Sequence, residues 1–141
     1  MNISIGNDHA GVELKQNILK ELQEHKVKNY GTNSSESVDY PDFAHELAKS
    51  IKIKKSDLGI QFCGTGNGIN MSANKHKGIR SALCWNVHIA EQSRLHNNAN
   101  ILTMPARHLN WNEVKEIVDV FLITKFEGGR HERRVKKINI S

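Results

Sequence analysis

Short apolar runs alternate with amphipathic stretches along the whole chain. Residues 2–6 are predicted to form a strand, and the stretch after them carries apolar residues at Val12, Leu14 and Ile18. These positions share one face at the helical period, so the spacing predicts a helix packed on a core. The same analysis predicts further strands at 27–30, 58–63, 79–84 and 99–104, and helices that begin at 41 and 69 or cover 88–96, 113–124 and 133–138.

This alternation of strands and helices determines the expected fold class. We predict an α/β fold, a Rossmann-like three-layer α/β/α sandwich with a five-stranded parallel sheet and right-handed crossovers. The 141 residues contain no repeat or linker, so we expect one domain over 1–141 that ends in a basic helix at about 130–139. Ligands of such sheets bind where the strands end at their carboxyl edge, and we expect the functional motifs there.

The composition excludes several classes of protein. Apolar residues make up 38% and charged residues 25% of the chain, as in globular proteins. No apolar run approaches the ~18 residues of a membrane span, and we expect no membrane partner. Two cysteines, Cys63 and Cys84, cannot build a disulfide framework, so we predict a cytoplasmic protein with free thiols. The eight histidines show no zinc-site spacing, so we predict no metal.

The net charge of +5 is concentrated at one end of the chain. Residues 130–141 hold five basic side chains and one acidic one, a net +4, whereas residues 1–129 hold 15 basic and 14 acidic side chains. No aromatic residues for base stacking accompany the basic segment, which disfavours nucleic acid as a partner. Arg130 and Arg134 are four residues apart, so in a helix they share a face that suits a small anion, although a solvated basic terminus is the commoner case.

Two motifs follow predicted strands directly. The pair Asp8-His9 offers proton transfer or hydroxyl binding, or else Asp8 simply caps the next helix. The run Cys63-Gly64-Thr65-Gly66-Asn67-Gly68 predicts a tight turn whose N–H groups face an anion at the start of a helix. A thiol entering such a turn ionises more easily, although a small buried residue is the more frequent fate of cysteine. Cys84 lies within a predicted strand, and we expect it to be a small buried residue of this kind.

Two further candidates lie later in the chain. His96 and Asn97, at the end of a predicted helix, offer acid–base chemistry and an amide for an oxyanion. The alternative is that the triplet His96-Asn97-Asn98 only ends the helix, with an asparagine as its cap in the left-handed conformation. Arg107 follows the fifth predicted strand.

Taken together, these motifs resemble the type B ribose-5-phosphate isomerase family. The resemblance extends from Ile3 to about Ile138, and its order and spacing are more specific than any single piece. It rests on six segments: 6–11, 39–41, 63–68, 73–80, 96–100 and 128–135. It implies a cofactor-free aldose–ketose isomerase of the pentose phosphate pathway, which interconverts ribose 5-phosphate and ribulose 5-phosphate. It also implies a homodimer, or a tetramer of paired dimers, with the site between subunits.

The resemblance implies a role for each matching residue. Cys63 would be the base that moves a proton between C1 and C2 through an enediolate. The backbone of 64–68 would hold the oxyanion, with the side chains of Thr65 and Asn97. His96 would open the furanose ring by protonating its oxygen.

The remaining matching residues would bind the substrate. Asp8 and Tyr40 would line the sugar. The phosphate would be bound by four side chains, some from the partner chain: His9, Arg107, Arg130 and Arg134.

Some residues depart from the family pattern, and other functions stay open. Asn67, the pair Asn70-Met71 and Pro105 are unusual for the family, and Pro105 restricts the loop that carries Arg107. A hexose-6-phosphate isomerase of the same fold, acting on allose 6-phosphate or galactose 6-phosphate, is one alternative. A non-catalytic nucleotide- or nucleic-acid-binding module is another, although the glycine run is neither a dinucleotide fingerprint nor a P-loop.

Overall fold

The computed structural model describes residues 1–140 of the chain. The elements follow one another as β1 (Asn2–Asn7), η1 (His9–Gly11), α1 (Val12–Glu21), β2 (Lys26–Asn29), α2 (Tyr40–Lys52), β3 (Leu58–Cys63), α3 (Asn67–Ala73), β4 (Ser81–Leu83), α4 (Val87–Asn97), β5 (Ile101–Pro105), α5 (Trp111–Ile123) and α6 (Arg130–Lys136). The predicted alternation of strands and helices is confirmed, and α6 lies within the range predicted for the basic helix.

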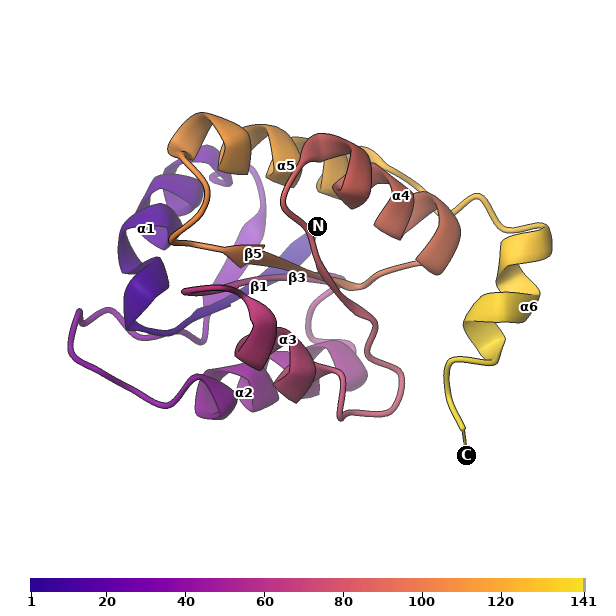
Figure 1. The fold of residues 1–141 in the computed structure, drawn as a ribbon, viewed down its shortest axis with the longest axis horizontal. Coiled ribbons are helices and arrows are strands. Elements are labelled where there is room, and N and C mark those ends of the chain that lie inside the picture. The colour runs from indigo at the N-terminus through magenta and orange to yellow at the C-terminus, as the bar shows by residue number, and fades with distance from the viewer. Residues whose placement is uncertain (141) are drawn as a thin grey trace.

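The five strands form one sheet in the order β2-β1-β3-β5-β4, and every pairing in it is parallel. Helices α1, α4 and α5 cover one face and α2 and α3 the other, which gives the predicted three layers (Figure 1). Helix α6 lies beyond the sheet, next to the end of α4. In this strand order, β4 forms one edge of the sheet.

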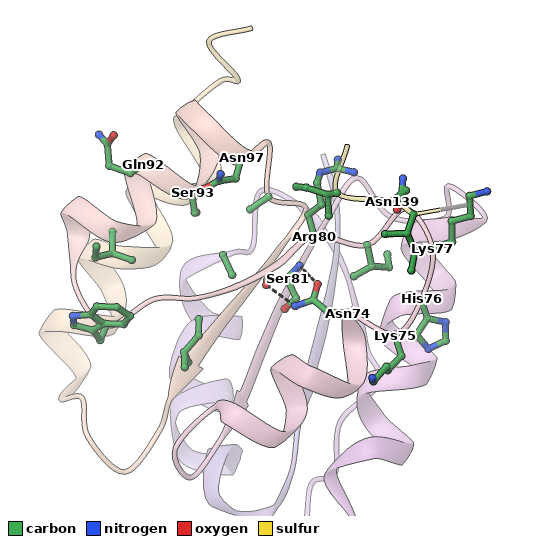
Figure 2. Close-up of a pocket in the computed structure, with 18 residues that line it drawn as sticks. Asn74, Lys75, His76, Lys77, Arg80, Ser81, Gln92, Ser93, Asn97 and Asn139 are labelled. Carbon is green, nitrogen blue, oxygen red and sulfur yellow. Dashed lines mark hydrogen bonds between the residues drawn. The ribbon is translucent and has the colours of Figure 1, made fainter. Parts of the chain in front are cut away.

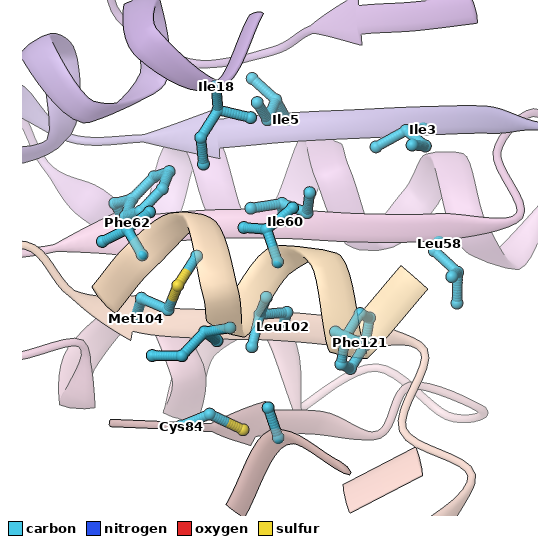
Figure 3. Packing of buried hydrophobic residues seen from close by; sticks show 14 of the residues in the cluster. Ile3, Ile5, Ile18, Leu58, Ile60, Phe62, Cys84, Leu102, Met104 and Phe121 are labelled. Atoms are coloured by element: carbon cyan, nitrogen blue, oxygen red, sulfur yellow. The ribbon is translucent and has the colours of Figure 1, made fainter. Parts of the chain in front are cut away.

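Each strand sends alternate side chains to opposite faces of the sheet, and each face has its own core. Phe62 packs in the larger cluster under α1, α4 and α5, together with Ile60, Met104 and Phe121 (Figure 3). Cys63, the next residue of β3, packs in the smaller cluster against α2 and α3. The alternation places the Cys63 thiol on the same side as the helix that follows the glycine-rich turn.

A buried polar contact fixes α3 to the sheet. The Gln61 side-chain amide donates to Thr103 Oγ1 on β5 at 2.8 Å and to the carbonyl of Ile69 in α3 at 3.3 Å. Gln61 is fully buried, so these bonds are made away from water and hold α3 at a defined height above β3 and β5.

Strand β4 is shorter than the predicted 79–84. The Arg80 N–H donates to the Asn100 side-chain oxygen at 2.8 Å instead of to a strand carbonyl, whereas the Arg80 carbonyl still accepts from the backbone N–H of Asn100 at 3.0 Å. Among residues 1–140, no helix is long and apolar enough to cross a membrane.

Candidate active site

The carboxyl edge of the sheet brings together the ends of β1, β3 and β5. The Ala106 N–H donates to the Cys63 carbonyl at 2.9 Å, and the Arg107 N–H donates to the Gly64 carbonyl at 3.1 Å. These two bonds join the start of the glycine-rich turn to the loop after β5. Cys63 itself is a free thiol with 5% of its surface exposed.

The glycine-rich turn has the conformation that its glycines predict. Gly66 adopts φ +81°, a left-handed conformation that favours glycine, and its carbonyl accepts from the Asn70 N–H at 3.1 Å as α3 begins. The Thr65 hydroxyl accepts from the Asn67 N–H at 3.3 Å. Within residues 1–140, the N–H groups of Gly64, Thr65 and Gly66 donate to no other protein group. A cysteine thiolate beside such N–H groups can remove a proton from a substrate whose new negative charge the N–H groups stabilise.

A cavity of about 500 Å³ opens at the same edge of the sheet, between the end of β1 and the start of α2. Asp8, His9 and Tyr40 line it. Asp8 accepts from the Ala10 N–H at 2.9 Å, which confirms the capping interpretation, and His9 Nδ1 accepts from the Val38 N–H at 3.3 Å. The cavity therefore gathers an acid, an imidazole and a phenol at the carboxyl edge.

Two predicted residues lie against the glycines of the turn. A Cβ atom at Gly68 would be only 2.3 Å from Tyr40 Cζ, and one at Gly64 would be 2.7 Å from Arg107 Nη1. Each glycine thus leaves room for a specific side chain. Arg107 is in place beside the turn although Pro105, the last residue of β5, restricts the loop before it.

The other predicted residues lie at the opposite edge, so our expectation that every motif would gather at the carboxyl edge is wrong. Helix α4 leads back from the end of β4, and His96 and Asn97 close it shortly before β5 begins. The five residues of β5 span about 16 Å at the usual rise per residue, so these side chains are far from Cys63. Asn98 ends α4 at φ +48°, which confirms the predicted left-handed cap.

Arg130 and Arg134 lie on α6, which packs beside the end of α4. They therefore accompany His96 rather than Cys63. Asn97 lines a groove of about 810 Å³ between the edge strand β4, α4 and the tail after α6 (Figure 2). Trp85 and Ile138 also line this groove, and each is about half exposed.

The structure adds two residues that sequence reasoning missed. Glu127 Oε2 is 3.6 Å from His96 Nε2 and 3.4 Å from His131 Nε2, and the two imidazole rings stack with their centroids 4.2 Å apart. The local signal in the sequence is the four-residue spacing of Glu127 and His131. Nothing in the sequence relates that pair to His96.

The second cysteine is structural, as predicted. Cys84 is completely buried, and burial raises the pKa of its thiol to about 11, although the Ser93 hydroxyl partly opposes this rise. The thiol therefore stays protonated at neutral pH. Of the two cysteines, Cys63 is the one placed for chemistry.

Comparisons with known proteins all match this chain to sugar phosphate isomerases. The family model for ribose/galactose isomerases matches residues 3–138. Ribose-5-phosphate isomerase B of Escherichia coli is 42% identical over 138 residues, which cover 96% of this chain and 93% of that protein. A putative sugar phosphate isomerase of Rickettsia conorii is 44% identical over 139 residues, covering 97% of this chain and 96% of that protein.

Solved structures agree with these relatives. A ribose 5-phosphate isomerase from Thermotoga maritima matches with a TM-score of 0.96 and 46% identity, covering 99% of this chain and 98% of that one. Ribose-5-phosphate isomerase B from Mycoplasma genitalium, solved with bound ribulose 5-phosphate, matches with a TM-score of 0.93 and 44% identity, covering 97% and 93%. With the thiol, the glycine-rich turn and the sheet edge in the places described above, this chain belongs to the ribose/galactose isomerase family.

Proposed function

We propose that this protein interconverts ribose 5-phosphate and ribulose 5-phosphate without a cofactor. The observation that carries the proposal is Cys63 at the entrance to a turn whose first N–H groups have no acceptor among residues 1–140. Relatives named for this reaction cover nearly the whole chain, and one of them was solved with ribulose 5-phosphate. The two free thiols fit a reducing compartment, and we place the protein in the cytoplasm.

The reaction needs a base and a stabilised enediolate. The Cys63 sulfur takes the proton from C2 of the open aldehyde, and the negative charge moves to O1. The N–H groups of 64–66, the Thr65 hydroxyl and the Asn97 amide stabilise this oxyanion, each such donor being worth about 3 kcal/mol. The proton returns to C1, and the O2 hydroxyl proton moves to O1, which leaves the ketone.

The other side chains hold the substrate in this orientation. Asp8 and Tyr40 contact the sugar in the cavity between β1 and α2, together with the backbone around Asn67 and Gly68. His96 protonates the ring oxygen of the cyclic aldose and so releases the aldehyde. The phosphate is bound by His9, Arg107, Arg130 and Arg134.

Because these residues lie at both edges of the sheet, we propose that the site forms between two copies. A two-fold axis perpendicular to the edge strand β4 reverses the strand direction, so the amino edge of one copy meets the carboxyl edge of the other. The groove beside β4, with its half-exposed Trp85 and Ile138, is the surface placed for this contact. His96, Asn97, Arg130 and Arg134 then complete the site around the other copy's Cys63.

Turnover and solvent exchange test the chemistry. Wild-type protein in D₂O should convert ribose 5-phosphate and exchange the C1 proton of ribulose 5-phosphate, whereas Cys63→Ala should remain folded and do neither. Cys84→Ala is the matched control, because that thiol is completely buried in the core on the opposite face of the sheet from Cys63. Exchange at the wild-type rate in Cys63→Ala would show that another group is the base. A higher kcat/KM on allose 6-phosphate or galactose 6-phosphate would assign a hexose instead.

Subunit mixing tests the shared site. Cys63→Ala and His96→Ala proteins, each inactive alone, are unfolded together and refolded. Half of the dimers are then mixed, and each mixed dimer has one intact site, so about a quarter of the wild-type activity should return. Mixed dimers that stay as inactive as their parents would place the whole site within one chain.

A further inference from the structure

Three side chains form a compact cluster at the end of α4 that the proposed mechanism uses only in part. The Glu127 carboxylate faces the Nε2 atoms of both His96 and His131, at 3.6 and 3.4 Å. The two rings are almost parallel, with 13° between their planes. His131 is buried, whereas His96 keeps 39% of its side chain exposed. The exposed ring is therefore supported on two sides.

The backbone around Glu127 is fixed to α4. The Glu127 N–H donates to the Leu95 carbonyl at 3.1 Å, one residue before His96. Arg94 Nε donates to the Thr124 carbonyl at 3.0 Å, at the other end of the same connection. These bonds couple the segment between α5 and α6 to the last turn of α4.

The environment of His131 favours the uncharged form of its imidazole. Burial, and next the neighbouring His96 ring, lower the pKa of His131, and Arg130 and Arg134 lower it further while Glu127 opposes them. His131 is therefore neutral at neutral pH. His96 is the ring exposed for contact with a ligand, and the Glu127 carboxylate lies beside its Nε2 atom.

The same three side chains also bring ligand atoms within 4.8 Å of one another, as a metal centre would. A metal requires the nitrogen lone pairs to converge on one point. Two rings that stack with nearly parallel planes direct their lone pairs side by side, so the geometry favours support of one ring by the other.

We propose that Glu127 and His131 are positioning residues for His96, which hold its imidazole in the orientation needed to protonate the ring oxygen of the cyclic sugar. The inference rests on the proposed function, because it concerns the ring-opening step. It adds two side chains that contact His96 and not the Cys63 turn of their own chain, so their effect should be largest on that step.

Kinetics of two partial reactions test this inference. Glu127→Gln removes the charge at an exposed position, and we expect kcat on ribose 5-phosphate to fall by about tenfold or more, in line with the loss of an acid–base contribution. Exchange of the C1 proton of ribulose 5-phosphate into D₂O needs no ring opening, and it should stay within about twofold of wild type, since the acid–base term concerns only the ring. Glu132→Gln is the matched control, because Glu132 pairs with Lys136 on α6. This substitution should change neither kcat on ribose 5-phosphate nor the rate of proton exchange.

A structural measurement separates positioning from general stability. NMR relaxation of the His96 ring should report a rigid ring in wild type and in Glu132→Gln, and a lower order parameter for this ring in Glu127→Ala and His131→Ala. His131→Phe keeps a flat ring for stacking and should restore the rigidity.

The outcomes are distinct. Unchanged kcat in Glu127→Gln, or a His96 ring equally rigid in all variants, would overturn the positioning role. So would activity that is lost with EDTA and restored by Zn²⁺, which would identify the cluster as a metal centre. Failure of the proposed function itself would appear as wild-type protein with neither turnover nor exchange, whatever the mobility of the His96 ring.

Discussion

A single methyl group at Gly68 should disturb the candidate site while leaving the fold intact. A Cβ atom there would lie 2.3 Å from Tyr40 Cζ and 2.6 Å from Cε2. Carbon atoms pack at about 3.5–4.0 Å, so the phenol must move by more than about 1 Å. Tyr40 is 39% exposed and begins α2, which lets its ring turn into solvent without disturbing the core.

Stability and activity should therefore change in different ways. Gly68 lies in α3, where alanine is favoured over glycine by up to about 1 kcal/mol, so the free energy of unfolding of Gly68→Ala should be unchanged or higher. A displacement of about 1 Å in a group that orients the substrate can lower kcat/KM by about 100-fold. We expect kcat/KM for ribose 5-phosphate to fall by this order. If Tyr40 only binds the substrate, most of the fall should come from a higher KM.

The control is Gly78→Ala, for which the opposite pattern is expected. In the part of the chain that the structure describes, no atom lies within 4 Å of the added Cβ, but φ is +85°, so the variant should lose about 1 kcal/mol of stability and keep its kinetics. Urea titration and steady-state assays measure both quantities. Wild-type kcat/KM in Gly68→Ala would refute the role of Tyr40, and a large loss of stability would show that the phenol cannot move.

Three further predictions follow from single contacts. Gly64→Ala should raise KM, measured with ribose 5-phosphate, because its Cβ would lie 2.7 Å from Arg107 Nη1 and displace the guanidinium from the turn. Phe121→Ala should lower the free energy of unfolding by about 3–5 kcal/mol in a urea titration, because the ring is completely buried. Between pH 9 and about 11 the folded protein keeps the Cys84 proton that the unfolded chain loses, so stability should fall as the pH rises. In wild type, the free energy of unfolding should fall by about 2–3 kcal/mol over this pH range. In Cys84→Ala, this fall should be absent when the free energy of unfolding is plotted against pH.

Local chemistry accounts for the parts of the site that the sequence predicted correctly. Asp8 caps the turn that follows it, and Asn98 ends α4 in the left-handed conformation. Both structures are determined by residues close by in the sequence. The turn after Cys63 likewise depends on its own glycines. The alternation of apolar runs predicts the layers, but it contains no information on strand order, because pairing joins strands such as β1 and β3 that are distant in the chain.

Direction along the sheet explains the error over His96. A residue that follows a parallel strand lies at the carboxyl edge, whereas a residue that precedes one lies at the amino edge. His96 and Asn97 precede β5, so the predicted elements already place them at the amino edge. The contact of Glu127 with His96 could not be predicted in this way, because it joins the segment after α5 to the end of α4 through tertiary packing.

The position of the positive charge follows from the same geometry. The chain carries most of its net charge in 130–141, on and after α6, while the thiol and the turn lie at the other edge of the sheet. A substrate with a phosphate at one end and a carbonyl at the other needs cations and a base several atoms apart. Within one copy, Arg130 and Arg134 lie a strand length away from Cys63, which is too far for a five-carbon sugar, whereas Arg107 lies beside the turn. A two-fold pairing across β4 shortens that separation without moving any residue within its own chain, so the proposed dimer is what turns two half-sites into one.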